Sequence, residues 1–142
     1  MNTSSRFAVS VHVLSLLAVT PGPVSSALIA GSVNTNPALI RRLLIDLGQA
    51  GFTRSVLGAG GGTLLARPPR EINLLDVYRA VEEPGVLGLH RSQPNPDCAV
   101  GRNITTVLGQ VFDRAQAATE RVIGALSLQD ILNQLKATQA AG

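Results

Sequence analysis

Apolar side chains recur every three or four residues in six stretches of the chain, which is the spacing of one face of an α-helix. We expect the apolar face of the first helix to combine Phe7, Ala8, Val11, Leu14 and Ala18. The six predicted helices cover residues 7–18, 24–30, 37–50, 72–81, 103–126 and 128–135. The pattern therefore predicts a mostly α-helical chain.

The third predicted helix is the most clearly bounded of the six. Asn36 is a good N-cap residue, and Pro37 suits the first helical position. Leucines follow Ile40 at i+3, i+4 and i+7, so this face is predicted to pack on a core. Arg41 and Arg42 then point outward.

A β-hairpin is predicted directly after this helix. Residues 52–56 and 63–67 are rich in strand-forming residues and flank the glycine cluster 58–62. A phosphate-binding glycine loop is the alternative, but such a loop leads into a helix, whereas here a strand and Pro68-Pro69 follow. The hairpin interpretation is therefore favoured.

Two short helices, a tight turn and a hairpin are typical of a winged helix-turn-helix that binds double-stranded DNA. The alternative is a winged-helix module that contacts another protein and lacks specific DNA binding. The residues that we expect to contact DNA are Ser25, Ser26, Asn36, Ala38, Arg41, Arg42, Arg54, Gly58, Gly60 and Gly61.

The long predicted helix at 103–126 carries an apolar seam whose members are four and three residues apart in alternation. Such a seam favours pairing with a second copy, and a homodimer implies a pseudo-palindromic operator. Packing on its own domain is the alternative. The predicted interface residues are Ile104, Leu108, Val111, Ala115, Ala118 and Val122.

The two halves of the chain differ in net charge. Residues 1–70 hold six arginines and one acid, a net charge of +5, whereas residues 71–142 hold six basic and eight acidic residues, a net charge of −2. A basic first half favours attraction to phosphate, although an uneven distribution on solvated surfaces would look the same. Four aromatic residues are too few for a single-strand binder. No catalytic constellation accompanies the two histidines, so an enzyme is not expected.

Cys98 is the only cysteine, which excludes an intrachain disulfide and fits the reducing cytoplasm. The apolar stretch 7–19 is interrupted and too short to span a membrane, so no membrane partner is expected. Arg91, Arg102 and the start of the long helix could lower the pKa of the Cys98 thiol, making it a candidate redox sensor. A structural cysteine is the alternative.

Four stretches, at 5–9, 36–47, 50–66 and 72–78, resemble the Rrf-type bacterial winged-helix regulators that include IscR, NsrR and CymR. Residues 95–104 are similar to its single-cysteine, YwnA-like branch. The resemblance implies a homodimeric regulator, usually a repressor. Its long helix would cross that of its twofold mate, while the helix from Pro37 enters the major groove and the wing the minor groove.

This resemblance also defines an expected organisation. We expect a winged helix-turn-helix at 1–83, a cysteine-bearing loop at 84–102, and a dimerisation helix with a C-terminal helix at 103–142. Cluster-binding members have three cysteines in that loop. With one cysteine, no iron–sulfur cluster, other cofactor or metal is expected. The family's arginine before the wing is Leu57 here, so Arg54 or Arg67 is expected to supply the minor-groove charge.

Overall fold

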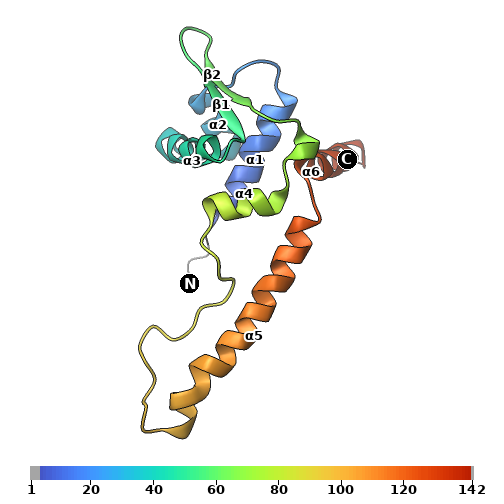
Figure 1. Cartoon of the computed structure of the whole chain (residues 1–142). Coiled ribbons are helices and arrows are strands. Elements are labelled where there is room, and N and C mark those ends of the chain that lie inside the picture. The colour runs from blue at the N-terminus through green and yellow to red at the C-terminus, as the bar shows by residue number, and fades with distance from the viewer. Residues whose placement is uncertain (1–3, 142) are drawn as a thin grey trace. The chain divides into compact units, whose positions relative to one another are not determined.

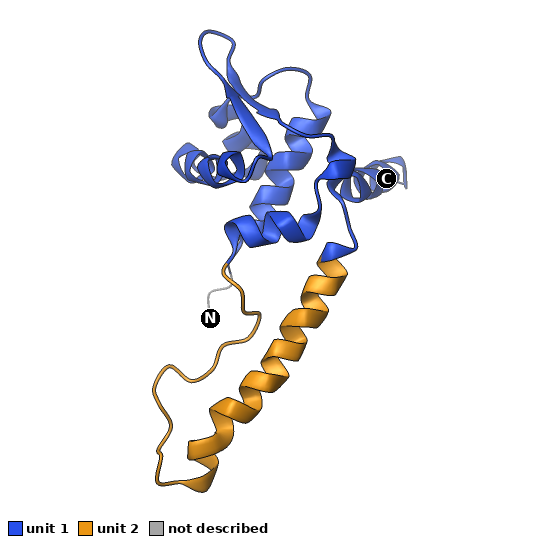
Figure 2. Ribbon diagram, viewed as in Figure 1, with its two compact units in different colours: residues 1–82, 124–142 blue, residues 83–123 orange. Residues whose placement is uncertain are grey.

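The computed structural model describes residues 4–141. The chain forms two compact units, residues 1–82 with 124–142 and residues 83–123 (Figure 2). The elements, labelled in Figure 1, are α1 (Arg6–Val19), α2 (Ser26–Val33), α3 (Pro37–Gln49), β1 (Thr53–Val56), β2 (Gly62–Leu65), the 3-10 turn η1 (Pro69–Glu71), α4 (Leu74–Val81), α5 (Ala99–Gly124) and α6 (Leu128–Ala141). The chain is thus mostly helical with one hairpin, as predicted.

Helix α1 is the centre of the first unit, where α2, α3, α4, β2 and α6 all contact it. Its buried side begins at Ser10 and continues through Val13, Leu14 and Leu17. The predicted face was therefore partly wrong, since Ala8 is exposed and Leu14 alone of the five is buried. A helix covered from several sides has no single apolar stripe, and a buried serine interrupts the pattern.

The buried hydroxyl of Ser10 has no hydrogen-bond partner among the described residues. We expect Ser10→Ala to raise the free energy of unfolding by about 1 kcal/mol, because an unsatisfied buried polar group is removed. Urea denaturation measures this change. Ser15→Ala is the matched control, since the Ser15 hydroxyl donates to the Val11 carbonyl at 2.7 Å. Equal destabilisation by both substitutions would contradict the prediction.

Helix α2 differs from its prediction at both ends. Val24 lies outside it, in an antiparallel bridge with Thr63 of the hairpin. The helix begins at Ser26, where the Ser25 side chain accepts a hydrogen bond from the Leu28 amide at 3.2 Å. It continues to Val33, and Asn34 ends it with a left-handed φ of 64°.

The prediction for α3 is confirmed in detail. The Asn36 side chain caps it, and Pro37 is its first residue. Ile40, Leu43 and Leu47 are buried in the core of the first unit. The chain leaves the helix through Gly51, whose φ of +83° favours glycine.

Helix α6 belongs to the first unit. A capping box starts it, because the Ser127 amide donates to Asp130 Oδ2 at 2.8 Å and the Asp130 amide donates to Ser127 Oγ at 3.2 Å. Leu128 is completely buried. The helix continues as far as Ala141, beyond its predicted end at residue 135. How the chain divides into functional domains stays a prediction.

The second unit contains the loop after α4 and helix α5. The helix begins at Ala99, four residues before the predicted start, and ends at Gly124. No residue of α5 is buried in the described part of the chain. The Val86 amide donates to the Gln116 side-chain oxygen at 2.9 Å, which ties the loop to the helix. Among the described residues, no helix is long and apolar enough to cross a membrane.

Candidate nucleic-acid interface

The N-terminus of α3 is held by its own cap. Asn36 Oδ1 accepts hydrogen bonds from the Ala38 amide at 2.8 Å and the Leu39 amide at 3.1 Å. Asn36 and Ala38 are both exposed. The cap satisfies two amides of the first turn, so Asn36, a residue expected to contact DNA, uses its side-chain oxygen within the chain.

The outward face of α3 borders a groove that it shares with the hairpin. Arg41 lies on this face, and residues three, four, seven and eight positions further on continue it. Arg42 is also exposed but does not line the groove. The lining residues are Ser26, Arg41, Leu44, Ile45, Gly48, Gln49, Ser55, Val56, Leu57, Gly62 and Thr63. Ile45 and Gln49 were not among the predicted contact residues, although both follow Arg41 at helical spacing.

The hairpin is short and turns tightly. Arg54 on β1 stands opposite Leu64 on β2, and its side chain is exposed. The Gly61 amide donates to the Gly58 carbonyl at 3.0 Å and closes the tip. Gly60, the third residue of this turn, has a φ of +75°, which favours glycine. The three predicted glycines therefore form the turn itself.

The Arg67 side chain makes its contacts within the chain. Its guanidinium lies over the Phe52 ring at 4.8 Å and donates to the Ala50 carbonyl at 2.9 Å and the Gly51 carbonyl at 3.2 Å. The arginine after β2 thereby fastens the end of α3 to the hairpin. The Arg67 donors are thus used within the chain, whereas Arg54 is the exposed arginine on the hairpin's strands. Which of the two supplies minor-groove charge stays a prediction.

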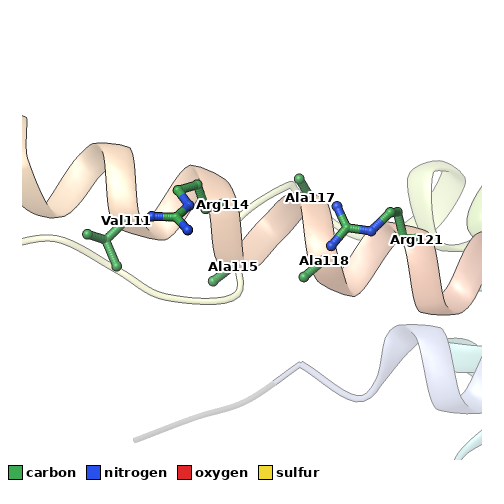
Figure 3. A pocket seen from close by; sticks show the side chains of 6 residues that line it. All are labelled: Val111, Arg114, Ala115, Ala117, Ala118 and Arg121. Carbon is green, nitrogen blue, oxygen red and sulfur yellow. The ribbon is translucent and has the colours of Figure 1, made fainter.

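The predicted seam on α5 is accessible within this chain. Val111 is 49% exposed and Val122 is 67% exposed, while Ile104, Leu108, Ala115 and Ala118 are partly exposed. Around its centre, Val111, Arg114, Ala115, Ala117, Ala118 and Arg121 line a shallow hollow (Figure 3). The small alanine side chains leave room there for the close approach of another helix.

Cys98 is exposed and directly precedes α5. Hydrogen bonds from the Gly101 and Val100 amides lower the pKa of the Cys98 thiol. The start of the helix thus acts as predicted, but arginines are not the cause. The Arg102 guanidinium instead donates to the Pro96 carbonyl at 3.2 Å.

The profile of the Rrf2 family, described as an iron-dependent transcriptional regulator, matches residues 3–134. YwnA of Bacillus subtilis (strain 168), a candidate HTH-type transcriptional regulator, is 40% identical over 93% of this chain and 98% of its own length. The structure of T. potens IscR superposes with a TM-score of 0.74 at 28% identity, covering 98% of this chain and 91% of that one. CymR, the global cysteine regulator of B. subtilis, has the same fold, with a TM-score of 0.68 at 22% identity over 94% and 98% of the two chains.

The profile is described as iron-dependent, which raises the question of whether this chain has side chains that could bind iron or an iron–sulfur cluster. The described residues contain no group of three or more His, Cys, Asp or Glu side chains that could hold a metal ion. Cys98 is the one cysteine of the chain. An iron–sulfur cluster is held by about four ligands. The side chains of this chain do not fit such a cluster.

The match over residues 3–134 agrees with the capped helix, the hairpin and the long helix described above. The matched profile and these relatives are all regulators and not enzymes, and the profile and YwnA are described as transcriptional regulators. The chain belongs to the Rrf2 family of bacterial helix-turn-helix transcriptional regulators.

Proposed function

We propose that the protein acts in the cytoplasm as a homodimeric repressor that binds a pseudo-palindromic operator. The observation that carries the proposal is the groove between α3 and the hairpin, with Arg41 on its border. In this arrangement α3 enters the major groove and the hairpin, the wing, reaches the adjacent minor groove. The net charge of +5 on residues 1–70 supports this orientation toward DNA.

The proposed contacts divide into base contacts and backbone contacts. Arg41 and Arg42, which are exposed on α3, would contact base edges or phosphates, and Arg54 would contact DNA from the wing. The starts of α2 and α3 and the glycine tip are the places proposed to lie against phosphate, although the Ala38 and Gly61 amides already donate within the chain. The residues at these places are Ser25, Ser26, Asn36, Ala38, Gly58, Gly60 and Gly61.

The first test concerns Arg41. We expect Arg41→Ala to weaken operator binding by roughly 5- to 150-fold, which corresponds to the loss of one good base contact. If Arg41 instead binds phosphate, the slope of log affinity against log salt concentration is expected to fall by about one. Fluorescence anisotropy with an operator selected from random oligonucleotides measures both quantities.

Arg91→Ala is the control, because it removes an exposed arginine from the loop of the second unit. This variant should bind DNA as the wild type does. Salt-insensitive binding, unchanged by Arg41→Ala and Arg42→Ala, would contradict the proposal and favour the protein-contact module.

The proposed dimer uses the seam of α5. Apolar side chains at alternating spacings of four and three residues form one continuous stripe on a helix that has no buried residue in the described chain. Pairing two such stripes would cover Val111 and Val122, which are otherwise 49% and 67% exposed. Two copies of α3 would then read the two operator half-sites.

We further propose that Cys98 makes the regulator responsive to peroxide. The thiolate attacks one peroxide oxygen, the O–O bond breaks, hydroxide leaves, and a sulfenic acid forms on the sulfur. The oxidised sulfur is bulkier and is a poorer acceptor for the Val100 and Gly101 amides. The first turn of α5 would therefore lose its cap, with consequences for the dimer that this helix forms.

We expect peroxide to change the operator affinity of the wild type several-fold, and a thiol reductant to restore it. Cys98→Ser is the matched variant, because a serine oxygen caps a helix well but is not oxidised. Anisotropy titrations before and after treatment measure the change. Identical responses of wild type and Cys98→Ser would exclude Cys98 as the sensor.

A further inference from the structure

The tip of the wing carries one side chain larger than a methyl group. Residues 57–62 read Leu-Gly-Ala-Gly-Gly-Gly, so beyond Leu57 the tip consists of backbone and the methyl of Ala59. Leu57 is 92% exposed, the largest exposed fraction among the large apolar side chains. Whatever the tip recognises is therefore contacted by bare backbone and one branched apolar side chain.

This narrow shape is enforced by close backbone contacts. A Cβ atom on Gly61 would lie 2.2 Å from the Val56 carbonyl oxygen, and one on Gly62 would lie 2.5 Å from the Val24 carbonyl oxygen. The Val24 and Thr63 backbones exchange hydrogen bonds of 3.0 and 2.9 Å at the base of the wing. Leu57 is thus presented from a supported hairpin and not from a loose loop.

The surroundings of Leu57 indicate what it meets. Arg41 borders the same groove, Arg54 is exposed on the adjoining strand, and residues 1–70 carry a net charge of +5. A basic surface with an apolar tip is complementary to DNA, where phosphates flank apolar base stacks. The minor groove is about 6 Å wide, which suits a tip that carries Leu57 and otherwise only backbone and one methyl group.

We propose that Leu57 is an apolar wedge that enters the minor groove and partly unstacks one base step of the operator. Proteins that insert leucine in this way kink the duplex, and the energetic cost of unstacking is lowest at flexible pyrimidine–purine steps such as TA. Leu57 would therefore select DNA by its deformability at a position that lacks base-edge hydrogen bonds. This proposal rests on the operator binding proposed above.

The test uses the full-length protein and an operator duplex labelled at both ends for energy transfer, with 2-aminopurine in the step next to the wing. We expect the wild type to bend the duplex and raise 2-aminopurine fluorescence. Leu57→Ala should bind about tenfold more weakly, with the bend and the fluorescence change lost. Replacing the TA step by GC should weaken the wild type but leave Leu57→Ala unchanged.

Leu135→Ala is the matched control, because Leu135 is also an exposed leucine, at 48%, but lies on α6. It should bend the duplex as the wild type does. Leu57→Arg should bind with a salt slope steeper by about one and without the bend. An unbent wild-type complex, or a bend that survives in Leu57→Ala, would overturn the wedge alone. A wild type that binds no DNA would overturn the proposed function as well.

Discussion

Ala118→Arg is expected to leave the protein monomeric at concentrations where the wild type forms the proposed dimer. Position 118 lies in the predicted seam of α5, where a methyl group permits close approach of a second helix. The new side chain would occupy that space and add a third guanidinium beside Arg114 and Arg121. Because one subunit can hold one half-site only, operator affinity should fall roughly 100-fold or more.

Analytical ultracentrifugation and anisotropy measure the two effects. Thr106→Arg is the control, since Thr106 is exposed on α5 but lies outside both the seam and the hollow. Arginine is a strong helix former, so neither substitution should unfold α5. A dimeric Ala118→Arg variant with wild-type operator affinity would show that α5 pairs through another face or not at all.

Phe52→Ala should lower the free energy of unfolding by about 3–5 kcal/mol, a large part of the stability of a small domain. Phe52 is 2% exposed and packs in the core beneath the Arg67 guanidinium. Its backbone also joins α3 to the hairpin, because its amide donates to the Leu47 carbonyl at 3.0 Å. Truncation would leave a cavity and remove the surface on which Arg67 lies.

Chemical denaturation monitored by circular dichroism measures this loss. Phe52→Leu is the conservative comparison, and it should cost less than about 1.5 kcal/mol because most of the volume is retained. Both variants lack the ring and therefore the cation–π contact with Arg67, so the difference between their stabilities reports the effect of the lost volume. A Phe52→Ala protein within about 1 kcal/mol of the wild type would mean that the core closes over the gap.

Local signals explain why α3 could be predicted almost completely. Asn36, Pro37 and Gly51 mark its ends by backbone chemistry, and the spacing after Ile40 marks its buried face. Each of these signals lies within the helix or next to it. The wing was predictable for the same reason, since its glycines are needed by the turn they form.

The predictions were wrong where residues far apart in the sequence determine the local structure. Val24 reads as the beginning of a helix, but its partner is Thr63, almost forty residues away. The buried face of α1 depends on five other elements, and Ser10 belongs to it despite its polarity. Nothing in the neighbouring sequence signals either arrangement.

The start of α5 shows a different limit. Gly101 in the run Ala99 to Arg102 weakens the helical pattern, and cysteine is an uncommon cap, so the loop was predicted to extend to residue 102. Only the backbone shows that the Cys98 carbonyl accepts from the Arg102 amide at 2.8 Å. The candidate sensor therefore lies next to the helix, four residues nearer to it than predicted.

The clamp made by Arg67 has a consequence for operator geometry. The Arg67 guanidinium donates to the end of α3 and stacks on Phe52, which leads into β1. The two elements proposed to read DNA therefore have little freedom to move separately. Less conformational entropy is then lost when the protein binds DNA, which favours affinity. The same rigidity fixes the spacing along the duplex between the proposed major-groove and minor-groove contacts. We therefore expect insertion of a single base pair between the major-groove and minor-groove contacts to be tolerated poorly, because about a tenth of a helical turn would separate the wing from its groove.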